Sequence, residues 1–231
     1  MTSNAYTMLE SAFHLPQALF FDLDGTLLDS LPGISFSIEQ AFTACGLPMQ
    51  ALDLGEVIGP PIRTILALAS AHATDSDLNL LERAFRSSYD SEGWQKTLLF
   101  PGSSPMLHEA CDLGIQIFVV SNKPRHIAVK ILEREGVLSL FTAVLTRDSS
   151  DPPYRSKAQM IEHLLRMFQL DVARCIMIGD TAEDAIAAAE MLVPFAWMAH
   201  GYGKIPPSLD VALRINSFPE LLPTLVKEFA Q

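Results

Sequence analysis

A short apolar run, Ala18 to Phe21, stops abruptly at the sequence Asp22-Leu23-Asp24-Gly25-Thr26. The run is too short for a helix and has no polar alternation, so it predicts a strand buried on both faces, as in a parallel sheet. Because residues i and i+2 of an extended chain point the same way, Asp22 and Asp24 are expected on one side of the chain, where this strand ends. In open α/β sheets, ligands bind at the carboxyl ends of the strands.

Two carboxylates held this close repel each other unless a cation or a shared proton offsets the repulsion. The pair Asp22 and Asp24 therefore predicts a metal site or an acid–base pair. Taken alone, however, the pair is more typical of a solvated turn in which Asp24-Gly25 supplies the bend. The residues downstream decide between these interpretations.

Strand and helix patterns alternate along the chain after residue 100. Apolar runs predict strands at residues 115–120, 142–145, 175–178 and 195–198, and helices are expected at 104–113, 124–135, 184–190, 219–229 and from about Ser156 onward. Such alternation is the signature of a doubly wound parallel sheet, so we expect an α/β fold.

The region from residue 31 to residue 97 has helical patterns and no convincing strand pattern. Ser30 is the expected N-cap of a helix that Gly46 closes, and two further helices are expected at 61–71 and 76–89. We therefore predict a core domain of residues 16–30 and 98–231, interrupted by an all-helical domain of residues 31–97. Residues 1–15 are expected to be a loose N-terminal extension.

The composition of the chain argues against several classes of protein. Hydrophobic residues make up 49% of the 231 residues and charged residues 19%, which suits a large buried core. The net charge of −11 leaves no basic stripe for nucleic acid or an anionic membrane. The three cysteines are far apart, and there is neither a secretory signal nor an apolar run that would span a bilayer, so we expect a cytoplasmic protein.

Polar residues that suit phosphoryl transfer follow the predicted strands or begin helices. Ser121 and Asn122 precede a helix whose N-terminus offers backbone N–H groups to an anion, although Ser121 as a simple N-cap is about as well supported. Lys157 lies in the first turn of a helix, where the helix dipole disfavours a cation, and this broken rule hints at function. A solvated surface lysine is nevertheless the commoner case.

Asp180 and Asp184 resemble Asp22 in their position, because they too follow an apolar strand, and they can supply oxygen ligands to Mg²⁺. Asp184 alone is equally typical of an acidic residue in the first turn of a helix. The six histidines have no metal-ligand spacing, which argues against zinc. The phosphate-binding loop, the dinucleotide-binding glycine motif and the Gly-x-Ser-x-Gly motif are not found.

Together these residues resemble the motifs of the haloacid dehalogenase superfamily of phosphatases. The first motif, Asp-x-Asp-Gly-Thr, matches residues 22–26, and the second, a Ser or Thr at the end of the next core strand, matches Ser121. The third, a Lys before a helix, matches Lys157, and the fourth, Gly-Asp-x-x-x-Asp, matches residues 179–184. The helical insertion resembles the C1 cap of that family. Several stretches, among them Gly201-Tyr202-Gly203, look most like its phosphoglycolate phosphatase-type branch.

The resemblance implies a role for each residue. Asp22 is expected to be the nucleophile that forms an aspartyl-phosphate, and Asp24 the general acid and then base, whose backbone carbonyl also binds Mg²⁺. Ser121 and Lys157 are expected to hold the phosphoryl oxygens. By the same resemblance, the metal ligands are Asp22, Asp24, Asp180 and Asp184, and further substrate contacts are Thr26 and Asn122.

Asp24 is informative about the reaction, because dehalogenases and phosphonate hydrolases of the superfamily lack this second aspartate. The sequence therefore predicts an Mg²⁺-dependent phosphatase of a small organic phosphate monoester similar to phosphoglycolate, acting as a monomer or homodimer. Alternatives within the superfamily are a nucleotidase or pyrophosphatase and a sugar phosphomutase. A non-enzymatic alternative is a phosphate sensor that accumulates the acylphosphate.

Arg63 is a candidate for substrate recognition. The sequence Gly59-Pro60-Pro61-Ile62-Arg63 places proline at a helix start and the arginine in the first turn. A guanidinium group facing the core would bind a carboxylate or second phosphate of the substrate. A surface arginine at a helix start explains the same pattern equally well.

Overall fold

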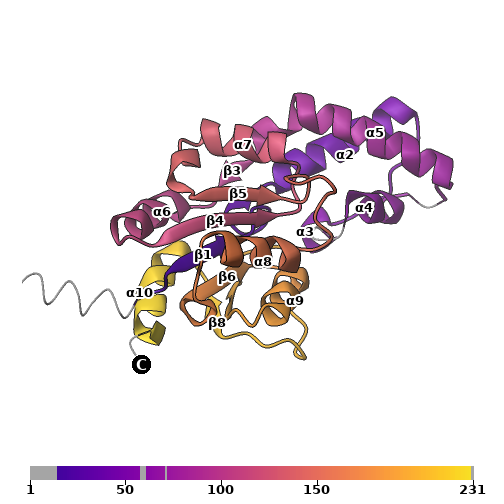
Figure 1. Cartoon of the computed structure of the whole chain (residues 1–231). Coiled ribbons are helices and arrows are strands. Elements are labelled where there is room, and N and C mark those ends of the chain that lie inside the picture. Colours follow the sequence, from indigo (N-terminus) through magenta and orange to yellow (C-terminus); the bar gives the residue numbers. More distant parts are fainter. Residues whose placement is uncertain (1–14, 58–60, 71, 230–231) are drawn as a thin grey trace, which may run out of the picture.

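The computed structural model describes residues 15–57, 61–70 and 72–229. Its centre is a six-stranded sheet in the order β5-β4-β1-β6-β7-β8, in which all neighbouring strands run parallel (Figure 1). The strands are β1 (Ala18–Phe21), β4 (Gln116–Ser121), β5 (Ala143–Thr146), β6 (Cys175–Gly179), β7 (Phe195–Met198) and β8 (Leu213–Ile215). The predicted doubly wound α/β fold is thereby confirmed.

Two helical layers cover the sheet, one on each face. The helices are α6 (Ser103–Asp112), α7 (Arg125–Arg134), α8 (Lys157–Met167), α9 (Ala182–Glu190) and α10 (Phe218–Phe229). Because side chains of a strand alternate between its faces, Leu19 and Phe21 of β1 pack with α6, α7 and α10, whereas Ala18 and Phe20 pack with α8 and α9. All four of these side chains have no exposed surface, as expected for a central parallel strand.

The register of the central strands brings the predicted polar residues together. Phe21 of β1 pairs with Val119 of β4 on one side and with Ile178 of β6 on the other. The next residue, Asp22, donates its backbone N–H to the carbonyl of Ile178 at 3.0 Å. The carboxyl ends of β1, β4 and β6 therefore meet at one edge of the sheet.

In the sequence, a block of helices separates β1 from the other strands of the sheet. We call this block, residues 31–97, the helical insert. It contains α2 (Leu31–Cys45), α3 (Leu54–Val57), α4 (Ile62–Leu68) and α5 (Asp75–Ser91), followed by a 3₁₀ helix (Gly93–Lys96). The chain enters and leaves the insert through two short antiparallel strands, β2 (Leu28–Asp29) and β3 (Leu98–Leu99). Figure 1 shows the insert at one end of the sheet, beyond the carboxyl ends of the strands.

The two long helices of the insert, α2 and α5, are amphipathic and pack against each other. Ile38 and Phe42 of α2 are buried with Leu81 and Phe85 of α5. Helix α2 ends at Gly46, as predicted, in the left-handed conformation (φ 65°) that glycine adopts without steric cost.

Several boundaries differ from the expectations. Ser30 stands at the N-cap position of α2, but its side chain makes no capping hydrogen bond. Helix α4 is shorter than predicted, ending at Leu68, and residue 71 lies outside the described residues. Helix α3, the β2–β3 pair and β8 were not predicted. Each is only two to four residues long, and none is a continuous apolar run of the length that predicted the short strands β1, β5 and β7. The expected N-terminal extension falls almost entirely outside the described residues.

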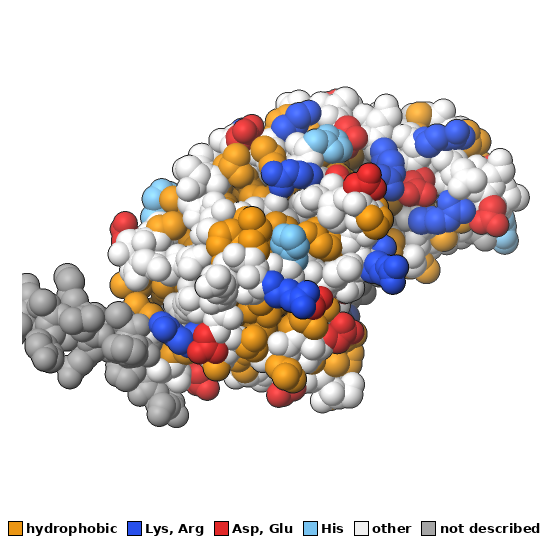
Figure 2. Space-filling model, viewed as in Figure 1, with side chains coloured by type: hydrophobic (Ala, Val, Ile, Leu, Met, Phe, Trp, Pro, Cys, Tyr) orange, Lys and Arg blue, Asp and Glu red, His pale blue; other side chains and the backbone are white. Residues whose placement is uncertain are grey.

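Two features of the structure concern the expectations about nucleic acid and membranes, namely the charges on the surface and the length of the helices. The face seen in Figure 2 carries basic and acidic side chains interspersed, without a continuous basic stripe. Within the described ranges, no helix is both long enough and apolar enough to cross a membrane.

Candidate active site

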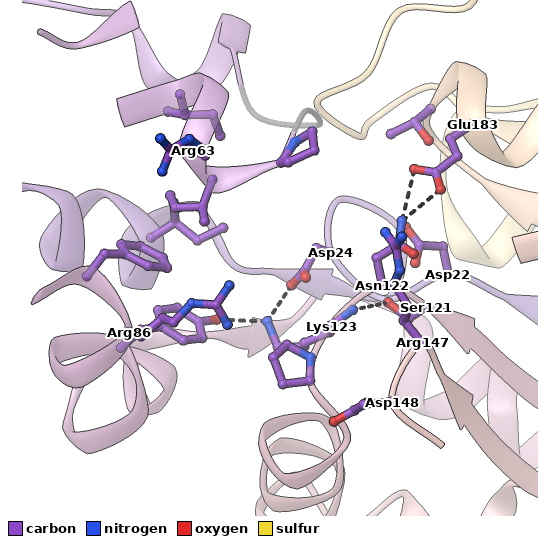
Figure 3. A pocket seen from close by; sticks show the side chains of 18 of the residues that line it. Asp22, Asp24, Arg63, Arg86, Ser121, Asn122, Lys123, Arg147, Asp148 and Glu183 are labelled. Carbon is purple, nitrogen blue, oxygen red and sulfur yellow. Dashed lines mark hydrogen bonds and ion pairs between the residues drawn. The ribbon is translucent and has the colours of Figure 1, made fainter. Parts of the chain in front are cut away.

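A cavity of about 760 Å³ opens between the carboxyl edge of the sheet and the helical insert. The core contributes Asp22, Asp24, Lys157 and Asp180, together with the turn from Ser121 to Pro124. The insert contributes apolar and charged side chains of α4 and α5 (Figure 3). The wall toward the insert includes Ile62, Arg63, Ile65, Phe85, Arg86 and Tyr89.

Three carboxylates form a buried cluster at the floor of this cavity. Oxygen atoms of Asp22, Asp180 and Asp184 all lie within 4.8 Å of one another. Lys157, at the start of α8, donates to Asp184 Oδ1 at 2.6 Å and lies 2.9 Å from Asp22 Oδ1. One lysine thus contacts two of three buried carboxylates, so the carboxylates of the cluster outnumber its cation.

The electrostatics of the cluster follow from burial. Burial raises the pKa of Asp22 to about 7; Lys157 opposes the rise and the neighbouring carboxylates add to it. Burial likewise raises the pKa of Asp180 to about 6, with Asp184 adding to the effect. Burial alone would lower the pKa of Lys157, but Asp184 and Asp22 outweigh it and hold this pKa above its ordinary value. These shifts describe carboxylates that favour a bound proton or cation.

Asp180 is fixed by donors from two distant parts of the chain. Its Oδ1 accepts a hydrogen bond from Thr26 Oγ1 at 3.0 Å, and its Oδ2 accepts bonds from the backbone N–H groups of Tyr202 (2.9 Å) and Gly203 (3.1 Å). Gly25, with φ 81°, packs against the same carboxylate, and a Cβ there would lie 2.3 Å from Asp180 Oδ2. The Gly-Thr pair of the first motif therefore serves to position Asp180.

Thr26 was expected to contact the substrate, and its side chain makes a different contact in the structure. Its side chain has no exposed surface, it does not line the cavity, and its hydroxyl is committed to Asp180. The side chain of Thr26 therefore supports a carboxylate of the cluster from behind, and its expected contact with a substrate stays a prediction.

Asp184 combines both interpretations that the sequence leaves open. Its Oδ2 accepts hydrogen bonds from the backbone N–H (3.0 Å) and hydroxyl (2.7 Å) of Thr181, which caps helix α9. Its Oδ1 accepts from Lys157. Asp184 is thus a first-turn helix acid and also a member of the buried cluster.

Asp24 lies apart from the cluster and faces Lys123, whose function the sequence did not reveal. Lys123 Nζ donates to Asp24 Oδ1 at 2.7 Å and to the hydroxyl of Tyr89 at 2.8 Å (Figure 3). Burial alone would lower the pKa of Lys123, but Asp24 and Tyr89 outweigh it and hold this pKa above its ordinary value. Because Tyr89 belongs to α5, this lysine joins a site carboxylate of the core to the insert. Its position directly after Ser121-Asn122 was the one available signal.

The remaining predicted residues lie on the cavity wall. Ser121, at the end of β4, accepts a hydrogen bond from the backbone N–H of Lys123 at 3.3 Å. Asn122 also reaches the cavity, but its amide donates to both carboxylate oxygens of Glu183 at 2.8 and 2.9 Å. The side chain of Asn122 is therefore occupied by a partner on α9.

Arg63 lies on the insert side of the cavity and is engaged within the insert. Its guanidinium group donates to Asn79 at 2.7 Å and to Asp75 at 3.0 Å, and it lies 3.5 Å from Glu82. Its expected contact with a substrate stays a prediction.

Comparison with known proteins agrees with this geometry. A family model described as haloacid dehalogenase-like hydrolase matches residues 16–191. The chain therefore belongs to the haloacid dehalogenase-like hydrolase family, as its four motifs predicted.

The similar proteins include relatives with two different names. A phosphoglycolate phosphatase of Agrobacterium fabrum is 29% identical over 217 residues, which cover 90% of this chain and 91% of the relative. The tyrosine-protein kinase PtkA of Mycobacterium tuberculosis is 31% identical over 191 residues, which cover 82% of this chain but only 64% of PtkA. Likeness to the phosphoglycolate phosphatase branch is thus confirmed.

Solved structures show the same fold. A haloacid dehalogenase-like family protein of Streptococcus pneumoniae superimposes with a TM-score of 0.80 at 25% identity, covering 91% of this chain and 98% of that one. The structure of PtkA gives a TM-score of 0.78 at 29% identity, covering 91% of this chain and 98% of the solved PtkA chain.

Proposed function

We propose that this hydrolase is an Mg²⁺-dependent phosphatase of a small organic phosphate monoester similar to phosphoglycolate. The observation that carries the proposal is the buried cluster of Asp22, Asp180 and Asp184 beside Lys157, at the floor of a cavity that Asp24 and Ser121 also line. The similarity to proteins named phosphoglycolate phosphatase supports the choice of substrate class.

The donor set of the cluster fits Mg²⁺. This ion takes oxygen ligands and is usually held by one or two carboxylates, with waters and substrate phosphate completing the set. Asp22 and Asp180 would hold it together with the backbone carbonyl of Asp24, and Asp184 would do so directly or through water. When bound, the ion supplies positive charge that stabilises the transferring phosphoryl group.

The residues of the chain divide the reaction into two steps. In the first, a carboxylate oxygen of Asp22 bonds to phosphorus while the ester P–O bond breaks, and Asp24 gives a proton to the leaving oxygen. In the second, Asp24 takes a proton from water, the water oxygen bonds to phosphorus, and the bond to Asp22 breaks, which releases phosphate. Ser121 and Lys157 hold the phosphoryl oxygens during both steps.

Phosphate release from a substrate panel tests this proposal. The panel contains 2-phosphoglycolate, nucleoside monophosphates, pyrophosphate and sugar phosphates, each measured with Mg²⁺ and with excess chelator. We expect Mg²⁺-dependent release that is fastest with small monoesters and that Asp180→Ala abolishes. Full turnover in chelator would contradict the metal dependence, and a preference for pyrophosphate or nucleotides would favour those alternatives.

The similarity to PtkA makes transfer to a tyrosine hydroxyl a second candidate. In that reaction the phosphoryl group would pass to a protein hydroxyl, whereas in the first candidate it passes to water. Incubation with γ-labelled ATP and a tyrosine-containing protein separates the two: stable label on tyrosine supports transfer to protein, and an unlabelled protein together with phosphate release from 2-phosphoglycolate supports hydrolysis.

A further inference from the structure

The cationic side chains that line the cavity differ in one respect, which is whether a carboxylate already faces them. They are Arg63, Arg86, Lys123, His126, Arg147 and Lys157. Lys123 and Lys157 face site carboxylates, Arg63 and Arg86 share Glu82, and His126 lies 3.4 Å from Asp90. Within the described ranges, the guanidinium group of Arg147 makes no hydrogen bond or ion pair.

The neighbouring acid, Asp148, stays charged but directs its carboxylate oxygens to other donors. Asp148 accepts hydrogen bonds from the backbone N–H of Arg125, at the start of α7, at 3.0 and 3.2 Å. It also accepts one from the hydroxyl of Thr146 at 2.7 Å. The acid thus fastens the loop after β5 to the start of helix α7, and among the described residues no ion pair joins it to Arg147.

The backbone of Arg147 is held next to the turn from Ser121 to Pro124, which contains the proposed phosphoryl contact Ser121. Its N–H donates to the carbonyl of Ser121 at 3.2 Å, and its carbonyl accepts from Tyr154 N–H at 2.9 Å. In Figure 3, Arg147 appears on the core side of the cavity beside Ser121 and Asn122, with Arg63 and Arg86 on the opposite side. The loop is therefore an ordered support for a free cation on the cavity wall.

The strand order places this cation at a useful distance from the nucleophile. Arg147 follows β5 and Asp22 follows β1, and β4 lies between these strands. Two strand spacings separate the strands by about 10 Å, and the register places Arg147 two residues, about 7 Å, beyond Asp22 along the strand direction. An arginine side chain and a short substrate tail together span this gap.

We propose that Arg147 binds a second anionic group, on the part of the substrate that is not transferred, and thereby selects phosphate monoesters that carry two anionic groups. The inference rests on the proposed phosphatase function. In a protein of net charge −11, a free guanidinium group offers local attraction to such an anion. Its planar fork suits a carboxylate or a phosphate equally.

A pair of esters that differ in one group tests the inference by binding. 2-Phosphoglycolate ends in a carboxylate, and 2-hydroxyethyl phosphate carries a neutral hydroxymethyl group in its place. Calorimetric titration with Mg²⁺ uses protein carrying Asp22→Asn, so that bound ester is not hydrolysed. In this Asp22→Asn background, Arg147→Ala is expected to raise the Kd of 2-phosphoglycolate about 10- to 100-fold, the loss expected for a charge-assisted hydrogen bond. The same substitution is expected to raise the Kd of the neutral ester less than about 2-fold.

Two further variants sharpen the result. Arg147→Lys keeps the charge but loses the fork, so it should recover only part of the affinity for 2-phosphoglycolate. Arg155→Ala removes an exposed arginine of the same loop that does not line the cavity, and it should leave both Kd values unchanged. Equal weakening of both esters by Arg147→Ala would overturn the inference and assign the arginine to the transferred group, and an unchanged Kd for both would also overturn it. Turnover of the unmodified protein on the panel above tests the phosphatase function separately.

Discussion

The hydroxyl of Thr26 shows how a single residue can act on a site without touching the cavity. It contributes one of three hydrogen bonds that hold the Asp180 carboxylate, and it has no exposed surface. Such partners orient a metal ligand, and their loss typically weakens metal binding. Thr26 should therefore affect the metal rather than the ester.

We predict that Thr26→Val raises the Mg²⁺ concentration needed for half-maximal activity about 10-fold. It should also lower the free energy of unfolding by about 1 kcal/mol, because a buried carboxylate loses a donor. Thr26→Ser keeps the hydroxyl and is the matched control. If Thr26→Val instead raised KM for the ester and left the Mg²⁺ dependence unchanged, Thr26 would be a substrate contact after all.

At the scale of elements, the contact between helix α5 and the sheet passes through buried polar groups. Lys123 is 3% exposed and bonds to Asp24 on the core and Tyr89 on α5. The Tyr89 hydroxyl lies 3.2 Å from Thr97 Oγ1, where the chain leaves the insert. This contact fixes the insert against the site carboxylate.

A double-mutant cycle measures that contact. Lys123→Met should lower the free energy of unfolding by about 2 kcal/mol, less than for a fully buried pair because Asp24 is 28% exposed. Tyr89→Phe should cost about 1 kcal/mol. In urea unfolding, the double variant should lose less than the sum of the single variants, by about 1 kcal/mol. Strict additivity would show that the two side chains act independently.

For the molecule as a whole, the sequence predicted the sheet better than it predicted the site contacts. The central strands are continuous apolar runs, so the local pattern of apolar residues is enough to predict their positions. By contrast, β8 is a short edge strand that contains Arg214. Asp22 and Asp180 come together because they follow the neighbouring strands β1 and β6, whereas helix α8 brings Lys157 to them. The pairing of Lys123 with Tyr89 could not be predicted, because it depends on how the insert packs on the core.

The buried carboxylates also govern stability of the whole molecule as the pH changes. Burial raises the pKa of Asp22 to about 7 and that of Asp180 to about 6, against about 3.9 in an unfolded chain. The folded form therefore binds these protons more tightly, and their stabilising effect is lost as the pH rises through 6 and 7.

Without metal, the unfolding temperature should decrease as the pH rises from about 5 to about 8. Mg²⁺ should raise the unfolding temperature more at pH 8 than at pH 5. Asp22→Asn removes one of the titrating groups and should flatten the metal-free profile. Scanning calorimetry in chelator and in Mg²⁺ provides the measurement. A metal-free stability that rises with pH over this range would contradict the electrostatic account of the cluster.

Intact-mass measurement after mixing with an activated aryl phosphate tests the central claim, that Asp22 takes the phosphoryl group and Asp24 moves the protons. Asp24→Asn keeps the backbone carbonyl but loses the proton shuttle. Because a nitrophenolate leaving group needs no proton, the first step should continue slowly and the second should stall, so a single phosphoryl adduct should accumulate. Asp22→Asn should show neither adduct nor turnover, since an amide is a poor nucleophile. An adduct on Asp22→Asn, or turnover by it comparable to the unmodified protein, would contradict the account.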